Sequence, residues 1–211
     1  MFFEIDQLIN SFELGDSNRN RIIIRKLRKY GDSISEYLYE RAVSAEDRFL
    51  SIQLLGAINE VKNDKLRKRM LNDADKEKDE FVLATFISLF RRIGLYEALP
   101  LIREKFSEAK DLRVKANCAE YLSEFGTMND LYLLEKYFDN PSTRVSINSI
   151  LASAMIAERI KGKCIQKLDS LYKSEDRVKA NGALFAMKKL NVPVSKKIFG
   201  LSFSNSIVNN Y

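Results

Sequence analysis

The acidic run NDADKEKDE, residues 72–80, is the stretch whose residue types and spacing come nearest to a metal site. Its carboxylates stand at alternate positions from Asp73 onward, as the oxygen ligands of an EF-hand calcium loop do. Such a loop also requires Gly at its sixth position and Glu at its twelfth. This chain has Lys78 and Ala84 there, so the sequence predicts a solvated loop between helices and no metal site.

Other residue types that carry catalysis are scarce in the 211 residues. The chain has no histidine, which removes the commonest general base and the commonest metal ligand. It has no tryptophan, and it contains no glycine-rich phosphate loop, CxxC pair or nucleophile elbow. We therefore expect a protein that is not an enzyme and that holds no cofactor.

Basic pairs recur near the ends of three expected helices and could contact phosphate groups. They are Arg28 and Lys29, Arg91 and Arg92, and Lys188 and Lys189. If equivalent helix ends lie along one rim, these cations form a phosphate-binding edge. The alternative is a favourable interaction with the negative end of each helix dipole, worth ~0.3–1 kcal/mol per residue. Two other copies have Asn59–Glu60 and Ser123–Glu124 near this position, which interrupts the rim.

The net charge of +6 is concentrated near the C-terminus. Residues 161–211 have ten Lys and Arg against three Asp and Glu, whereas residues 1–160 have 25 against 26. With 45% hydrophobic and 30% charged residues, the chain has the composition of a soluble globular protein. The two cysteines, Cys118 and Cys164, sit in different expected helices. Together with the lack of a secretory signal or a long apolar run, they favour a cytoplasmic protein without a membrane span.

The elements that position these side chains follow a repeat. RVKAN occurs at Arg113 and again at Arg177, and RVSIN places a third copy at Arg144, so the spacings are 31 and 33 residues. Between Asp111 and Gly126 the apolar residues recur every three to four positions, which predicts an amphipathic helix. Asp111 is placed to cap the start of this helix, and Gly126 to end it as a C′ glycine.

Looser copies extend the repeat over the whole chain, and each copy is a pair of helices. The second helices of the pairs are expected at 19–31, 47–59, 81–94, 113–126 and 144–157, and from 177 onward. The first helices are expected at 34–44, 62–72, 96–107, 128–138 and 160–172, with 3–13 as the opening helix. A fixed period of about 30 residues is typical of a protein whose neighbouring repeats bury each other's apolar stripes.

One polar position is shared by the three clear copies. It is occupied by Asn117, Asn148 and Asn181. We expect each side-chain amide to bond the backbone of a neighbouring repeat, which would form a ladder of hydrogen bonds along the stack.

The segments DLRVKANCAEYLSEFG and DNPSTRVSINSI resemble the HEAT-repeat family, in the short bacterial form known from phycobilisome-lyase-like proteins. The resemblance is specific over residues 96–191 and weaker over 17–95. It implies an all-α fold, a right-handed α-solenoid of about six antiparallel helix pairs over residues 1–191, with the second helices lining the concave face. Residues 192–211 leave the pattern and are expected to form a capping tail.

If the second helices line a concave face, their outward positions form the candidate binding surface. These positions are Ile87, Arg91, Glu120, Ile147, Ile150, Leu151, Leu184 and Met187. The expected helix 144–157 is apolar on nearly every side, so it must be covered or must bind a partner. The tail 192–211, which contains an apolar cluster, is one candidate cover, and a partner protein is the other.

These features predict a non-catalytic interaction module that binds a protein or peptide on its concave face. One alternative is binding of a nucleic-acid backbone, because HEAT-like alkylpurine DNA glycosylases resemble this chain in size, helical content and basic charge. Those enzymes depend on aromatic residues in their cleft, tryptophan among them, and this sequence has no tryptophan. A further alternative is a bilin lyase or a bilin chaperone, by resemblance to the phycobilin lyases.

Overall fold

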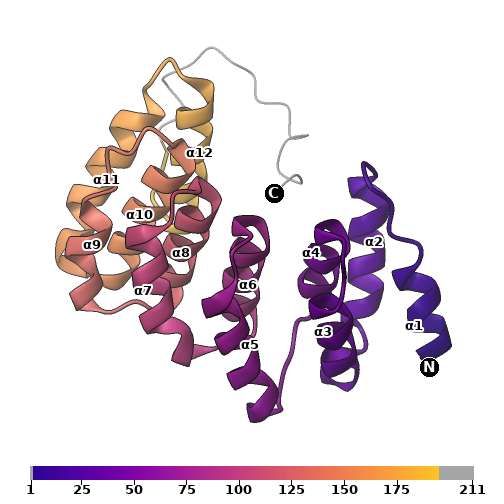
Figure 1. Cartoon of the computed structure of the whole chain (residues 1–211). Coiled ribbons are helices and arrows are strands. Elements are labelled where there is room, and N and C mark those ends of the chain that lie inside the picture. Colours follow the sequence, from indigo (N-terminus) through magenta and orange to yellow (C-terminus); the bar gives the residue numbers. More distant parts are fainter. Residues whose placement is uncertain (1, 195–211) are drawn as a thin grey trace.

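The computed structural model describes residues 2–194, and Figure 1 shows them as an arc of helices. This part of the chain contains no β-strand, so the prediction of an all-α protein is confirmed. Most of the predicted capping tail, residues 195–211, lies outside the described residues.

The helices form pairs, in the order expected from the repeat. The first helices of the pairs are α1 (Phe2–Ile9), α3 (Ser35–Val43), α5 (Asp64–Lys76), α7 (Leu99–Glu108), α9 (Leu131–Glu135) and α11 (Glu158–Tyr172). The second helices are α2 (Ser17–Arg28), α4 (Arg48–Ala57), α6 (Glu80–Arg92), α8 (Leu112–Phe125), α10 (Thr143–Ile156) and α12 (Arg177–Lys189). Short 3-10 turns precede three first helices: Gly31–Ile34, Tyr96–Ala98 and Met128–Asp130.

Two helices are shorter than the periodicity predicts. The helix α1 ends at Ile9, because the amide of Asn20 holds the following chain by exchanging two hydrogen bonds with the backbone of Glu13. The helix α9 begins as a 3-10 turn in which Thr127 and Asp130 form a capping box. Apolar spacing locates a helix, but such local hydrogen bonds decide where it begins and ends.

A carboxylate opens nearly every second helix. Asp16, Asp47, Asp79, Asp111 and Asp176 each accept hydrogen bonds from backbone N–H groups in the first turn, and Ser142 does so for α10. These N–H groups have no partner within the helix, so the caps stabilise each start. The predicted cap at Asp111 is confirmed.

Gly126 ends α8 for a reason other than the one expected. Its φ of −68° is accessible to any residue, so the helix does not end in the left-handed conformation of a C′ glycine. A Cβ at this position would instead collide with the carbonyl oxygen of Leu122 and would lie 2.8 Å from Cδ1 of Ile156 in α10. Glycine is therefore needed where the end of α8 approaches the end of α10.

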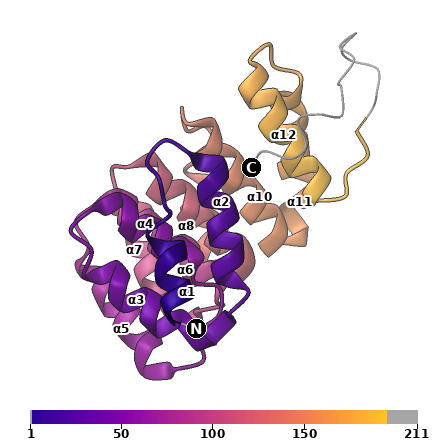
Figure 2. The same cartoon turned by 90° about the vertical axis from the view of Figure 1, so that its right-hand side faces the viewer.

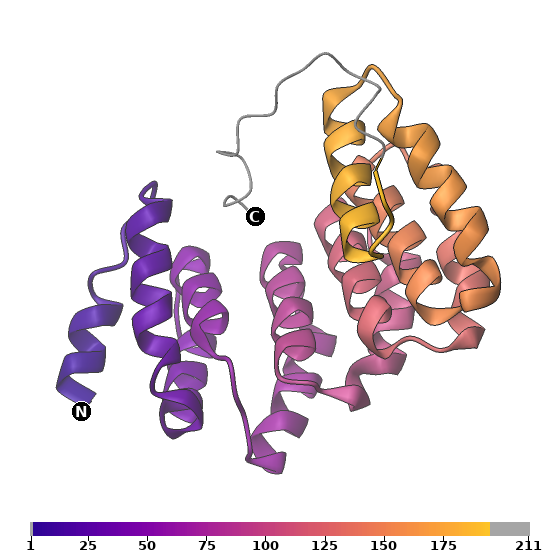
Figure 3. The same ribbon diagram turned by 180° about the vertical axis from the view of Figure 1, so that it is seen from behind.

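The second helices contact each other in succession, α2 with α4, α4 with α6, α6 with α8, α8 with α10 and α10 with α12. Each first helix, α1, α3, α5, α7, α9 and α11, packs on the second helix of its own pair. In Figure 1 the second helices lie on the inner side of the arc and most first helices on its outer side. Figure 3 shows the same arc from behind, from indigo α1 to yellow α12.

The buried apolar residues form two clusters. The larger extends from α1 to α8 and also includes Leu134 of α9 and Ala152 of α10. The smaller joins Phe138 to residues of α10, α11 and α12, and Val192 and Val194 pack against it. In Figure 2 the pair α11 and α12 stands to one side of the earlier helices, which is consistent with a separate apolar cluster around this pair.

Candidate functional site

The residues of α10 that were expected on the binding surface are buried, which corrects the largest part of that prediction. Ile147, Ile150 and Leu151 are at most 5% exposed, and Met187 of α12 is also buried. The reason is that α11 and α12 both pack on α10, so neighbouring helices cover its apolar sides. Neither a partner nor residues 195–211 are needed to explain a helix that is apolar all round.

The remaining predicted surface residues divide into two groups. Ile87 belongs to the larger apolar cluster, and Leu184 is only partly exposed. Arg91 and Glu120 are the two that keep accessible charged groups, with side chains 33% and 31% exposed. Their guanidinium and carboxylate lie 3.7 Å apart, so the structure brings these two together across α6 and α8.

The predicted basic rim is interrupted because two of its arginines turn inward. Arg28 donates to the carbonyl oxygen of Gly56 at 2.7 Å, and Arg92 donates to that of Ile58. Both acceptors are at the C-terminal end of α4, where carbonyl groups have no partner within the helix. Burial, reinforced by the nearby charges of Arg28 and Arg91, lowers the pKa of Arg92 to about 10. These two arginines therefore stabilise the C-terminal end of α4. They interact with the dipole of α4 and not with the dipoles of their own helices.

The other rim residues do not form one surface either. Arg91 pairs with Glu124 at 2.6 Å, whereas Lys29, Lys188 and Lys189 are exposed. Lys29 follows α2, and the two lysines end α12, at opposite ends of the arc. The rim expected from equivalent helix ends is therefore wrong as a continuous edge.

The predicted asparagine ladder is present in two of its three positions. Asn117 donates to the carbonyl oxygen of Ala84 at 2.7 Å, and Asn148 to that of Ala116 at 3.1 Å. Each acceptor lies in the second helix of the preceding pair. Asn181 is exposed, and within the described part of the chain it makes no equivalent bond. The ladder joins α6, α8 and α10 and ends there.

A network of charged and amide side chains covers the inner side of these three helices. Arg144 of α10 donates to Asn117 at 2.7 Å and to Glu120 at 3.0 Å. Glu120 also accepts a hydrogen bond from Asn148 at 3.0 Å. Through Glu120 the network reaches Arg91 of α6. These side chains hold one another in place, and the side chain of Arg144 is still 52% exposed.

An aromatic side chain held between two arginines lies beside this network and was missed from the sequence. The guanidinium carbons of Arg48 and Arg113 lie 4.5 Å and 3.1 Å from the ring centroid of Phe81, which is 39% exposed. The hydrogen bond from Arg113 lowers the pKa of Asp111, which holds this arginine in turn. One signal was available, because Phe81 stands two residues after a capping Asp, where the RVKAN copy has Arg113.

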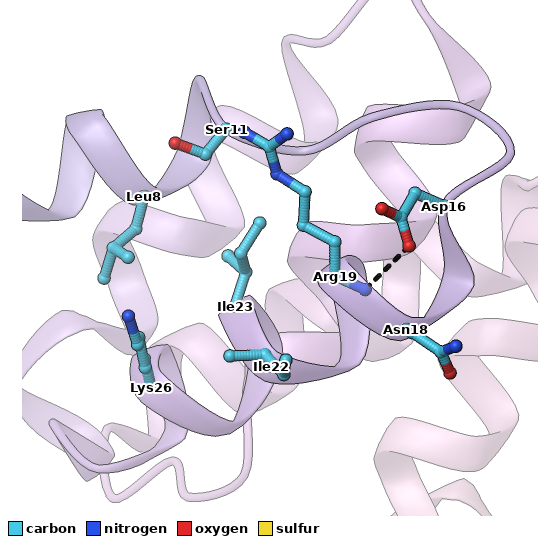
Figure 4. A pocket seen from close by; sticks show the side chains of 8 residues that line it. All are labelled: Leu8, Ser11, Asp16, Asn18, Arg19, Ile22, Ile23 and Lys26. Carbon is cyan, nitrogen blue, oxygen red and sulfur yellow. Dashed lines mark hydrogen bonds between the residues drawn. The ribbon is translucent and has the colours of Figure 1, made fainter.

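The groove of about 580 Å³ between α1 and α2 was also missed. Figure 4 shows Ile23 and Lys26 of α2 near Leu8 of α1, and Arg19 extending toward Ser11. Its lining combines apolar side chains with Arg19, Lys26 and the carboxylate of Asp16, and Arg19 is paired with Glu13. Lys26 is therefore the cation of this groove that forms no ion pair within the described part of the chain. The sequence marks Lys26 as part of a basic cluster but gives no sign that α1 forms the opposite wall.

The side chains of the described residues offer little covalent chemistry. Cys118 and Cys164 are both buried, and burial raises the pKa of the Cys164 thiol to about 11. A thiol with so high a pKa is a poor nucleophile at neutral pH. Among the described residues there is no group of three or more His, Cys, Asp or Glu that could hold a metal ion. No helix of residues 2–194 is long and apolar enough to cross a membrane.

No protein-family model matches the sequence, and no curated protein matches it either. The function proposed for this protein therefore rests on the residues and contacts described above.

Proposed function

We propose that this chain is a right-handed α-solenoid of the HEAT type and that it binds a protein or peptide through its second helices. The packing of each second helix on the next supports the solenoid, and the repeated Asn bonds support a common geometry for the central repeats. Stacked helix pairs present an extended inner surface, which is suited to a long segment of a partner.

The observation that carries the binding proposal is the polar face, defined as Phe81, Arg113, Glu120, Arg144 and Asn148. These side chains are accessible and are ordered by contacts with each other or with their neighbours. Ordering before binding reduces the entropy that a complex loses when it forms. Arginine and aromatic side chains are also the types most enriched among residues that dominate binding energy.

The polar face contains both signs of charge, so its partner is expected to contain both as well. Arg113 and Arg144 can each donate further hydrogen bonds to a carboxylate, and Glu120 can accept from a cation. A partner that carries only apolar groups would leave these charges desolvated and unpaired, which costs free energy. The proposed partner is therefore a polar segment of a protein.

Affinity capture with immobilised full-length protein tests the proposal. The double variant Arg113→Ala, Arg144→Ala is compared with the unaltered protein and with a matched variant, Lys68→Ala, Lys76→Ala, on α5. The control removes two exposed cations from a first helix. We expect at least one protein to be retained by the unaltered chain and the control, and its recovery to fall about tenfold with the double variant, as the loss of ~1.4 kcal/mol would give.

Identical sets of captured proteins for all three chains would contradict the polar face as the binding site. Circular dichroism melting of each variant establishes that it is folded.

The proposed location is the cytoplasm, since two unpaired cysteines suit a reducing compartment. The bilin alternative has no support from any described side chain, and an unchanged visible absorption band on mixing with a bilin would dispose of it.

A further inference from the structure

The outward side of α2 is a dense cluster of positive charge. It is called the basic face and consists of Arg21, Arg25, Lys26 and Lys29, all exposed, around Ile22, which is 53% exposed. The helix α2 itself contains no Asp or Glu. Its opposite side is buried through Ile23 and Leu27, so the cations are directed away from the apolar cluster.

The charges of the basic face are not neutralised within the described part of the chain. None of its four cations forms an ion pair there, whereas the neighbouring Arg19 pairs with Glu13 at 2.9 Å. Of the flanking carboxylates along the chain, Asp16 caps the start of α2 by accepting a hydrogen bond from the backbone N–H of Arg19, and Asp32 accepts one from the backbone N–H of Lys62. Like charges crowded on one helix repel each other, so a bound anion would reduce this electrostatic repulsion.

The spacing of these cations matches a linear polyanion. Arg21, Arg25 and Lys29 follow one another at every fourth residue, which is about 6 Å along a helix and about 12 Å from first to last. One nucleic-acid strand advances about 3.4 Å per phosphate, so the row faces three or four successive phosphates. We propose that the basic face binds the phosphate backbone of a nucleic acid without regard to its sequence.

The composition of the basic face favours this partner over a membrane surface, because four cations surround a single exposed apolar side chain. Arg25 stands nine residues after its capping Asp16, as Glu120 does after Asp111, so the two occupy equivalent positions on α2 and α8. Ile22 and Lys26, in contrast, stand where α8 has the buried residues Asn117 and Tyr121. The basic face therefore extends from Arg25 onto the side of α2 that no preceding second helix covers. Ile22 alone also supplies too little apolar area to anchor a helix in lipid.

The adjoining groove is consistent with the same partner. Arg19, Ile22 and Lys26 line its α2 side, and in Figure 4 Lys26 lies near Leu8 whereas Arg19 extends toward Ser11. A sugar or base adjacent to the bound phosphates could contact the apolar side chains here, beside the unpaired cation of Lys26. This contact needs no hydrogen bond to a base edge, so it adds affinity without adding sequence preference.

Fluorescence anisotropy with a labelled 20-base-pair DNA duplex of arbitrary sequence tests the proposal in full-length protein. With four phosphate contacts, the association constant should fall by about 100-fold between 50 and 200 mM NaCl. In the double variant Arg25→Gln, Lys29→Gln the same change of salt should produce a fall of only about tenfold, and binding at 50 mM NaCl should be at least about tenfold weaker. The matched control, Lys68→Gln, Lys76→Gln on α5, has the same net charge and should bind as the unaltered chain does.

Three outcomes would overturn the proposal. They are no binding of the duplex at 50 mM NaCl, equal weakening by the two double variants, and binding to phosphatidylserine vesicles in place of the duplex. Thermal melting of both variants checks that each is folded. The test is independent of the protein-binding proposal, because the polar face and the basic face share no residue and each has its own variant.

Discussion

The side-chain amide of Asn148 illustrates what a repeated residue does in this protein. It joins α10 to the backbone of α8 and also bonds Glu120, whereas Asn181, in the same position of α12, is exposed and makes no such bond. The two residues follow almost the same letters, RVSIN and RVKAN. Their environments nevertheless differ, so the two positions form a natural pair of variant and control.

We predict that Asn148→Ala lowers the free energy of unfolding by about 1–2 kcal/mol, since it removes the hydrogen bonds from its amide to the Ala116 carbonyl and to the Glu120 carboxylate. Asn181→Ala should change it by less than about 0.5 kcal/mol, as exposed substitutions do. Urea unfolding followed by circular dichroism measures both. Equal losses in the two variants would show that the hydrogen bond from Asn148 to the Ala116 carbonyl does not stabilise the fold.

Residue-level prediction from the sequence succeeded where a contact is local and failed where it is not. Asp111 is predictable as a cap because its acceptor role involves only the next few residues. Arg28 and Arg92 were assigned to a rim, but they reach the end of α4, which is 28 and 34 residues away along the chain. Helix periodicity gives no information about which of several nearby carbonyls a long side chain meets.

At the scale of helices, two glycines show that the same residue can serve opposite purposes. Gly126 ends α8 where a Cβ would meet the Leu122 carbonyl and the Ile156 side chain. Gly162 lies within α11, and a Cβ there would meet nothing within 4 Å. The first glycine is required by packing, whereas the second only weakens its helix.

The substitution Gly126→Ala should therefore destabilise the fold by about 1–3 kcal/mol, as overpacking does. The substitution Gly162→Ala should stabilise it by about 0.5–1 kcal/mol, because alanine favours the helix and restricts the unfolded chain. The midpoints of urea unfolding curves report both effects. A stabilising Gly126→Ala would mean that α8 and α10 can separate at that end without cost.

The positions of the helices were predictable because amphipathic spacing and capping residues are local signals. The surroundings of α10 were not. Its apolar residues on all sides indicate burial, and most of them are buried, but the covering elements are α8, α9, α11 and α12. The periodicity of α12 shows which of its residues share a face and leaves open which helix that face meets.

At the scale of the whole molecule, the two apolar clusters divide the described chain unequally. Cys118 belongs to the larger cluster and Cys164 to the smaller, so each contains one buried thiol. Local opening takes the least free energy where the fewest apolar contacts are lost. The smaller cluster, formed by Phe138 and helices α10 to α12, is therefore expected to open first.

Iodoacetamide at pH 8 should consequently modify Cys164 at least about tenfold faster than Cys118 in the native protein, a difference of ~1.4 kcal/mol in opening. Peptide mass spectrometry distinguishes the two sites. In urea both thiols should react at the same rate, which controls for their intrinsic reactivity. Equal native rates would show that the two clusters open as one cooperative unit, a property that the repeat pattern alone does not decide.

The register of the asparagine bonds has a consequence for the length of the protein. Asn117 and Asn148 each bond the residue that precedes the equivalent position in the helix before them, Ala84 and Ala116. If residues 112–142 were duplicated, the second copy of Ala116 would offer its carbonyl oxygen to Asn148, as Ala116 does now. The second copy of Asn117 would bond the Ala116 carbonyl of the first copy. Chains of this design can therefore lengthen by duplication within a gene, since the new unit brings both halves of the interface it needs.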